Sequence, residues 1–212
     1  LHTLFPYTTL FRSTSFSLTI RHIPRGRVTS RLFTYTSQHL LHSFPLPSLE
    51  LPLLGIGGSF ILPRLPTKML WIAGGIGVTP FLAFAGEMAG GEGEWEVEML
   101  AATREPEVIA QLVRSALGRE GGGKVRLRLQ IHFFSDAPPP PADFFESLAP
   151  GVVVTTTYHT GRIGSGDFAR FGAFGEGQVF LCGPPEFEKV VLEGLGKAGV
   201  QEAKVTRESF DY

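Results

Sequence analysis

The chain is poor in the side chains on which disulfide scaffolds, metal centres and hydrolase sites depend. Its 212 residues contain one cysteine, Cys182, which excludes a disulfide within the chain and cannot supply the four thiolates of an iron–sulfur cluster. The six histidines show no metal-ligand spacing such as His-x-x-x-His, so we interpret His132 and His159 as structural or surface residues and expect no metal site. No Ser, His and Asp arrangement indicates a hydrolase triad.

Net charge is also nearly absent. Nineteen Lys and Arg side chains against twenty Asp and Glu give a formal charge of -1, so electrostatics give no reason to expect a nucleic acid or an anionic membrane as partner. Small molecules are the better expectation. The apolar content of 43% is that of a soluble globular protein, and we expect an intracellular one, in the cytoplasm or the mitochondrion.

One run, Met69–Gly86, carries no charged residue and could by its length be a membrane helix. However, Gly74, Gly75, Gly77 and Pro80 crowd its centre. A strand, a glycine turn and a helix therefore explain the run better than a membrane span does.

The first residues fit no natural element. The stretch "TLFPYTTLFRS", Thr3–Ser13, is interrupted by Pro6 and has neither a strand period nor a helix period. It also lacks the basic leader and small-residue cleavage site of a signal peptide. It resembles the translation of a sequencing-library adapter joined to a coding region at about Thr14, and we treat residues 1–13 as an artefact.

Residues 14–66 are predicted to be rich in strands and turns. Alternating apolar residues predict a strand at Phe16–Ile20, residues 28–41 allow a short helix, and residues 49–63 suggest a strand, a glycine turn and a second strand. This part holds no complete core of its own.

From residue 67 onward, strands and helices alternate, which predicts a mostly parallel sheet covered on both faces. The proline-rich run "SDAPPPPADFF" predicts a stiff extended loop. The predicted strands are Met69–Ala73, Trp95–Ala101, Val125–Phe133, Val152–Thr157 and Gln178–Leu181. The predicted helices are Pro80–Met88, Glu107–Gly118 and Glu186–Ala198, with a weaker one at Asp167–Phe171.

The stretch "MLWIAGGIGVTPFLAF" places a buried strand before a glycine turn and a helix. Thr79 suits the N-cap and Pro80 the first helical position, so the helix start offers free amides and a positive dipole to an anion such as a pyrophosphate. Gly74, Gly75 and Gly77 allow close approach, although Pro80 stands where the standard dinucleotide fingerprint has its third glycine or alanine. A tight turn that merely packs well is the plainer interpretation.

A second stretch, "QVFLCGPPEFEKVVLEGL", repeats the strand, turn and helix near the end of the chain. It puts Cys182, Gly183 and Pro184 at the carboxyl end of a strand, the edge at which open α/β sheets bind ligands. Outside this motif, Cys182 would be interpreted as a small buried hydrophobic residue.

Together, "IAGGIGVTPFL", "TREPEVIAQL", "GRI", "VFLCGPPEFEKVV" and the terminal "RESFDY" resemble the ferredoxin-NADP reductase family of flavoproteins across residues 66–212. Upstream, "RHIPRGRVTSRLF" and "GIGGSFILP" resemble parts of that family's flavin domain. The resemblance implies two domains: a truncated antiparallel β-barrel that binds FAD, residues 14–66, and an α/β parallel-sheet domain that binds NAD(P)H, residues 67–212.

The resemblance also implies residue roles. Gly74, Gly75, Gly77 and Thr79, with Pro80, would hold the pyrophosphate and ribose of NAD(P)H, and Cys182, Gly183 and Pro184 would lie beside the nicotinamide. The flavin-phosphate turn would be formed by Gly26, Val28 and Thr29. The flavin ring would be approached by Glu208, Phe210 and Tyr212. The family's flavin-stacking motif of Arg, any residue, Tyr and Ser or Thr is missing, because the adapter-like stretch ends where it should stand.

The sequence thus predicts an FAD-dependent NAD(P)H oxidoreductase that passes electrons to an unidentified acceptor: an iron–sulfur protein, a haem protein or a small molecule. Arg104, just after the second predicted strand, could accept the 2′-phosphate of NADPH or be a solvated charge, and Arg162 leaves the same alternatives open. The alternative function is a nucleotide-binding module that holds no flavin and catalyses nothing.

Overall fold

The fold is taken from a computed structural model of the 212-residue chain, which describes residues 24–26, 28–41, 59–65, 67–118, 125–169 and 177–209. The chain divides into two compact units, Leu1–Gly57 and Gly58–Tyr212. In the described part of the first unit, residues 29–41 form helix α1 (Thr29–Leu41), which confirms the short helix predicted there. The predicted strand Phe16–Ile20 lies outside the described residues.

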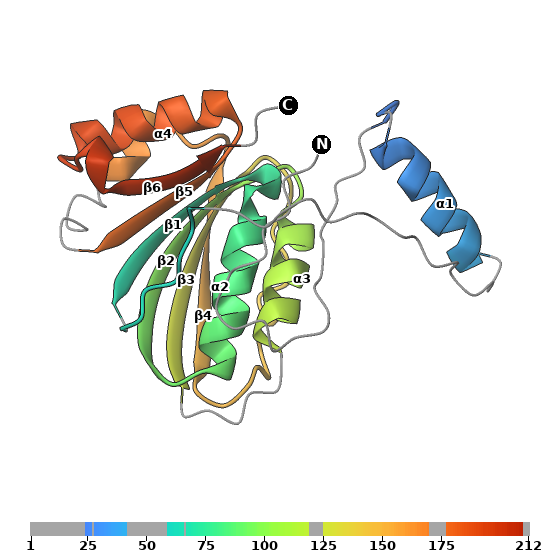
Figure 1. The fold of residues 1–212 in the computed structure, drawn as a ribbon, viewed down its shortest axis with the longest axis horizontal. Coiled ribbons are helices and arrows are strands. Elements are labelled where there is room, and N and C mark those ends of the chain that lie inside the picture. Colours follow the sequence, from blue (N-terminus) through green and yellow to red (C-terminus); the bar gives the residue numbers. More distant parts are fainter. Residues whose placement is uncertain are drawn as a thin grey trace. The chain divides into compact units, whose positions relative to one another are not determined.

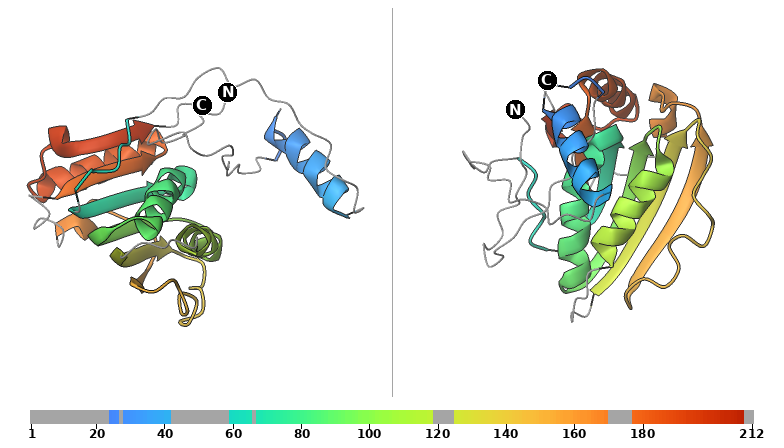
Figure 2. Two further views of the ribbon diagram at one scale, coloured as in Figure 1. Left: turned by 60° about the horizontal axis from the view of Figure 1, so that its bottom comes forward. Right: turned by 90° about the vertical axis from the view of Figure 1, so that its right-hand side faces the viewer.

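The second unit is built on one six-stranded sheet in which every strand pair is parallel, as Figures 1 and 2 show. The strand order is β4-β3-β2-β1-β5-β6. The strands are β1 (Lys68–Gly74), β2 (Gly93–Ala102), β3 (Val125–Ser135), β4 (Val152–Thr160), β5 (Gln178–Gly183) and β6 (Val205–Ser209). The predicted parallel α/β domain is therefore confirmed.

Helices cover both faces of this sheet. Helices α2 (Thr79–Gly90) and α3 (Pro106–Leu117) lie on one face and α4 (Pro185–Lys197) on the other (Figure 1). The short 3-10 helices η1 (Gly75–Val78) and η3 (Glu202–Lys204) follow β1 and precede β6. The connection from β3 to β4 contains no α-helix or strand in residues 136–151, which confirms a loop at the proline-rich run.

Each face has its own apolar core, because successive side chains of a strand point to opposite faces. On the α4 face, Leu70, Ile72 and Leu181 are fully buried against Val191 and Leu195 of α4. A separate aromatic cluster occupies the α2 face, where the rings contact one another across the strands and the helix. Its members are Phe60, Trp71, Phe81, Phe84 and Phe180. Burial of each such side chain contributes about 1.5–3 kcal/mol.

Two details of the sequence prediction were wrong. The second strand predicted within residues 49–63 is absent from its described part, since residues 59–65 are irregular. The main-chain amides of Ser59 and Phe60 donate to the side chain of Glu208 and not to a neighbouring strand. Conversely, β6 was not predicted, because Val205 is its only buried apolar residue and the strand stands at the edge of the sheet. The antiparallel barrel falls mostly on residues outside the described ranges.

Candidate functional site

The strand order places a switch point between β1 and β5. From β1 the chain proceeds through β2 and β3 to β4 on one side of the sheet, whereas β5 and β6 lie on the other side. Ala73 of β1 is in register with Cys182 of β5, so the turns that follow these two strands begin side by side. Ligands of open α/β sheets bind in the crevice at this point. The structure thus brings together the two motifs that the sequence singled out.

The helical start after β1 differs from the one predicted. Helix η1 runs directly into α2, so Val78 precedes the first α2 residue, Thr79, and already has helical backbone angles. The Thr79 hydroxyl donates to the Ile76 carbonyl, 3.1 Å away, and makes no cap bond. Thr79 is therefore not an N-cap, and Pro80 is the second helical residue. The first amides of the helical run belong to Gly75 and Ile76, and they have no acceptor within η1, because the first bond of a 3-10 helix is made by the third residue.

Packing within the edge accounts for three of its glycines. A Cβ on Gly77 would lie 2.2 Å from the carbonyl oxygen of Cys182, so only glycine lets η1 lie against β5. On Gly74 and Gly183 a Cβ would lie 2.7 Å and 2.5 Å from the ring of Phe187. Gly75 has a φ of 55°, in the left-handed region that favours glycine.

Phe187 is a residue of this edge that the sequence analysis missed. It lies in the first turn of α4, where the Pro184 carbonyl accepts its amide at 2.9 Å. Its ring fills the space next to both Gly74 and Gly183 and packs against the α4-side core. Gly74 and Gly183 both face this one aromatic ring, but no local sequence pattern connects the three residues.

Cys182 is completely buried, with 0% of its surface exposed. Burial raises the pKa of its thiol far above the ordinary value, and the carboxylates of Glu208 and Glu188 raise that pKa further. The side chain is therefore a neutral thiol at physiological pH. It cannot act as a thiolate nucleophile.

Glu208 of β6 stands in register with Cys182, so both side chains lie on the same face of the sheet. Only 9% of Glu208 is exposed. Its Oε1 accepts the main-chain amides of Ser59 and Phe60, the latter at 3.1 Å, and lies 3.2 Å from the Ser59 hydroxyl. Its Oε2 is buried and has no hydrogen-bond partner among the described residues. A buried polar atom of this kind requires an explanation.

Two arginines lie beyond the same edge of the sheet. Arg104 is exposed and follows β2, the strand next to β1. Arg162 is exposed too, but it follows β4, at the far end of the strand order. Of the two, Arg104 therefore follows the strand that lies next to the switch point.

The residues predicted for the flavin are placed only in part. Gly26 and Val28 precede α1 in the first unit, and Thr29 is the first residue of α1, with 5% of its surface exposed. Phe210 and Tyr212 lie outside the described residues. Their proximity to a flavin stays a prediction.

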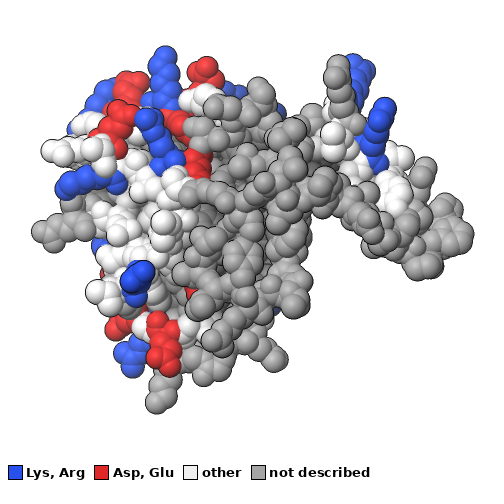
Figure 3. All heavy atoms as spheres, viewed as in Figure 1, with Lys and Arg blue, Asp and Glu red and all other residues white. Residues whose placement is uncertain are grey.

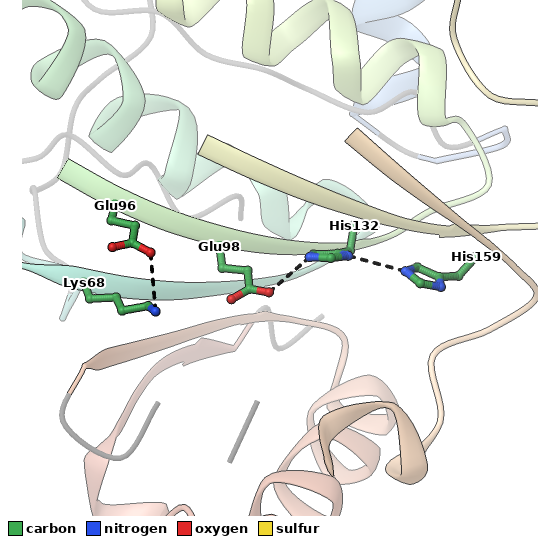
Figure 4. A network of polar contacts seen from close by, with 5 residues as sticks. All are labelled: Lys68, Glu96, Glu98, His132 and His159. Atoms are coloured by element: carbon green, nitrogen blue, oxygen red, sulfur yellow. Dashed lines mark hydrogen bonds and ion pairs between the residues drawn. The ribbon is translucent and has the colours of Figure 1, made fainter. Parts of the chain in front are cut away.

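A second polar cluster lies away from the switch point, on β2, β3 and β4 (Figure 4). His132 Nε2 lies 3.1 Å from Glu98 Oε1, and His132 Nδ1 lies 3.4 Å from His159 Nε2. His132 is only 4% exposed, so it is a structural residue of the sheet face. In the described part of the chain no group of three or more His, Cys, Asp or Glu side chains could hold a metal ion.

The described surface carries charges of both signs. In Figure 3 basic and acidic side chains are interspersed over the described residues of the visible face. Among the described residues, no helix is long and apolar enough to cross a membrane.

No protein-family model and no curated protein matches the chain. Among solved structures, it is similar to the flavohemoglobin from Malassezia yamatoensis with bound FAD and heme, at 21% identity and a TM-score of 0.44, over 69% of this chain and 32% of that one. It is also similar to the flavohem-like FAD/NAD binding domain of nitric oxide dioxygenase from Vibrio cholerae O1 biovar El Tor, at 21% identity and a TM-score of 0.39. The latter match covers 73% of this chain and 55% of that chain. The chain thus spans well under two thirds of either protein.

Proposed function

We propose that this chain binds a nicotinamide dinucleotide at the carboxyl edge of β1 and β5, as the NAD(P)H-binding part of an FAD-dependent oxidoreductase. The observation that carries the proposal is the meeting of two turns at the switch point. One is the start of η1 at Gly75, and the other is the turn at Cys182, Gly183 and Pro184. Such a crevice is where open parallel sheets hold nucleotides.

The residues present suit a dinucleotide. The first amides of the helical run, at Gly75 and Ile76, provide hydrogen-bond donors and a positive dipole end for the pyrophosphate. Arg104 is our candidate for the 2′-phosphate, which favours NADPH over NADH. Thr79 and Pro80 begin α2 directly after η1 and are also our candidates for the pyrophosphate and ribose side of the nucleotide.

The nicotinamide would lie against the β5 edge beside Cys182 and Gly183. The neutral, fully buried thiol supports this edge from within and takes no proton in the reaction. The unpartnered oxygen of Glu208 is the acceptor that this edge offers to a donor group. When bound, FAD supplies the acceptor for the hydride and hands electrons onward.

The flavin part of the proposal rests on the resemblance to the ferredoxin-NADP reductase family. Gly26, Val28 and Thr29 are our candidates for the flavin phosphates, and Phe210 and Tyr212 for the ring. The electron acceptor would be an iron–sulfur protein, a haem protein or a small molecule.

A charge placed at the helical start tests nucleotide binding. Ile76→Glu puts an anion next to the proposed pyrophosphate, whereas Ile76→Gln is nearly the same size and neutral. Like charges about 5 Å apart near a protein surface repel by about 1–3 kcal/mol. We expect the Kd for NADPH, measured by isothermal titration calorimetry, to rise at least about tenfold for Glu and less than about threefold for Gln. Equal affinities of both variants and the unmodified chain would refute this site.

Flavin content distinguishes the reductase from the alternative, a nucleotide-binding module without flavin. The gene is re-isolated from its source and its product is purified beside this chain. A yellow product that oxidises NADPH with an artificial electron acceptor supports the reductase. A colourless product that still binds NADPH supports the module.

A further inference from the structure

The two carboxylate oxygens of Glu208 have very different surroundings. Among the described residues, the donors that reach the carboxylate come from residues 59–60 and meet at Oε1. Oε2 is buried and has no donor in the part of the chain that the structure describes. The carboxylate is therefore fixed from one side only, by the segment that leads into β1.

Ser59 contributes more than one contact to this arrangement. Its main-chain amide donates to Glu208 Oε1, and its hydroxyl lies 3.2 Å from the same oxygen and 3.0 Å from the Arg207 carbonyl. A serine hydroxyl has one proton to donate, so it joins the segment to β6 through whichever of these two acceptors it takes. The neighbouring residue is held separately, because the ring of Phe60 packs against Phe180 and Phe81 at centroid distances of 5.3 Å and 5.5 Å.

Residues 59–60 lie on the sheet face that carries Cys182. Phe180, Cys182 and Glu208 all point to this face, by strand alternation and by the register of β5 with β6. The ring of Phe60 contacts Phe180, and the main-chain amides of Ser59 and Phe60 donate to Glu208. Cys182 is the neighbour of both attachment points on this face, since it follows Phe180 by two residues on β5 and is in register with Glu208 on β6, and it is fully buried.

We propose that Ser59 is a positioning residue: it holds one oxygen of Glu208 on the segment entering β1, and so closes residues 59–60 over Cys182 and keeps the other oxygen at the β5 edge. The consequence for nicotinamide binding rests on the proposed function. The closure itself concerns only residues of this chain and is measurable without any cofactor.

The single cysteine makes the closure measurable, because every thiol modified in the intact chain is Cys182. We would follow alkylation by iodoacetamide at fixed pH, using intact-mass spectrometry, for the unmodified chain and for Ser59→Ala, Ser59→Thr and Ser115→Ala. Loss of one hydrogen bond to a charged group should make Ser59→Ala react at least about ten times faster. Ser59→Thr retains a hydroxyl and should stay within about twofold of the unmodified chain. Ser115 is exposed on α3, and its replacement should change nothing.

A double-mutant cycle separates positioning of Glu208 from a general loosening of the segment. In a Glu208→Met background no acceptor remains at residue 208, so Ser59→Ala should add less than about twofold to the rate. Should Glu208→Met fail to fold, as judged by circular dichroism, Glu208→Gln serves instead, and the effect of Ser59→Ala should fall to that of a neutral hydrogen bond, about fivefold or less.

Two results would overturn the proposal: a Ser59→Ala rate within twofold of the unmodified chain, or the same fold-change in both backgrounds. Titration of NADPH into the same proteins distinguishes a failure of this inference from a failure of the proposed function. The expected thiol pattern without nucleotide binding would leave the positioning role intact and refute the nucleotide site. Nucleotide binding without the expected thiol pattern would refute the positioning role and leave the nucleotide site intact.

Discussion

Replacing Gly77 by alanine tests how the edge between β1 and β5 is assembled. The added Cβ would lie 2.2 Å from the Cys182 carbonyl oxygen and 2.6 Å from its carbonyl carbon. Both atoms belong to the main chain of β5, which is paired on both sides and cannot rotate away. Either η1 or β5 has to move by about an ångström to restore an ordinary contact near 3.4 Å.

Overpacking of this kind costs about 1–3 kcal/mol, and a main-chain collision belongs at the upper end. We therefore expect Gly77→Ala to lower the free energy of unfolding by about 3 kcal/mol. For a protein of this size that corresponds to a fall in Tm of about 6–12 °C. Gly196→Ala is the matched control, since a Cβ there meets nothing within 4 Å. Gly196 lies near the end of α4, where alanine should add up to about 1 kcal/mol.

The assay is urea denaturation followed by circular dichroism, with both variants measured beside the unmodified chain. A Gly77→Ala protein as stable as the Gly196→Ala control, within about 0.5 kcal/mol, would refute the close approach of η1 to β5. The expected result would establish that packing alone requires this glycine, whether or not a nucleotide binds.

Three further predictions concern other parts of the second unit. Phe84→Ala removes a ring packed between Trp71 and Phe180 and should cost about 3–5 kcal/mol in urea denaturation. Glu98→Ala takes the acceptor from buried His132 and should lower the free energy of unfolding by about 1–2 kcal/mol, whereas Glu96→Ala, whose ion pair with a lysine is exposed, should cost less than about 0.5 kcal/mol. Folding raises the pKa of Cys182 above its ordinary value of 9.0, so the stabilisation is complete below that pH and is lost as the pH rises above it. The free energy of unfolding should then fall with pH by up to about 1.4 kcal/mol per unit, and an alanine at this position should remove that slope.

The central strands and their helices could be predicted because their signal is local. Met69–Ala73 was read from an uncharged run before a glycine turn, and β1 covers it with one residue more at each end. Buried parallel strands produce such continuous apolar runs, and the helix after each one is marked by its own apolar period. The two motifs of the site were found for the same reason, since each lies at the end of one such strand.

The remaining features depend on contacts between distant parts of the chain. Thr79 has every local property of an N-cap, but η1 places the preceding residue in helical geometry, and the hydroxyl bonds to Ile76. Ser59 and Glu208 are separated in the sequence by most of the second unit, and no sequence pattern links them. Phe187 meets Gly74 only because β1 and β5 are neighbours in the sheet. None of these relations has a period or a motif by which a sequence could reveal it.

The glycines of the edge show why motif and function have to be tested apart. Gly74, Gly77 and Gly183 are each required by a contact inside the protein, so a nucleotide-free domain with this packing would need the same three residues. The motif therefore indicates a particular assembly of β1, η1 and β5 first, and a ligand only through the amides which that assembly exposes. Substitutions at the glycines report on assembly. Side chains that packing leaves half-exposed or exposed, such as Ile76 and Arg104, report on the ligand, because they can change charge without disturbing the strands behind them.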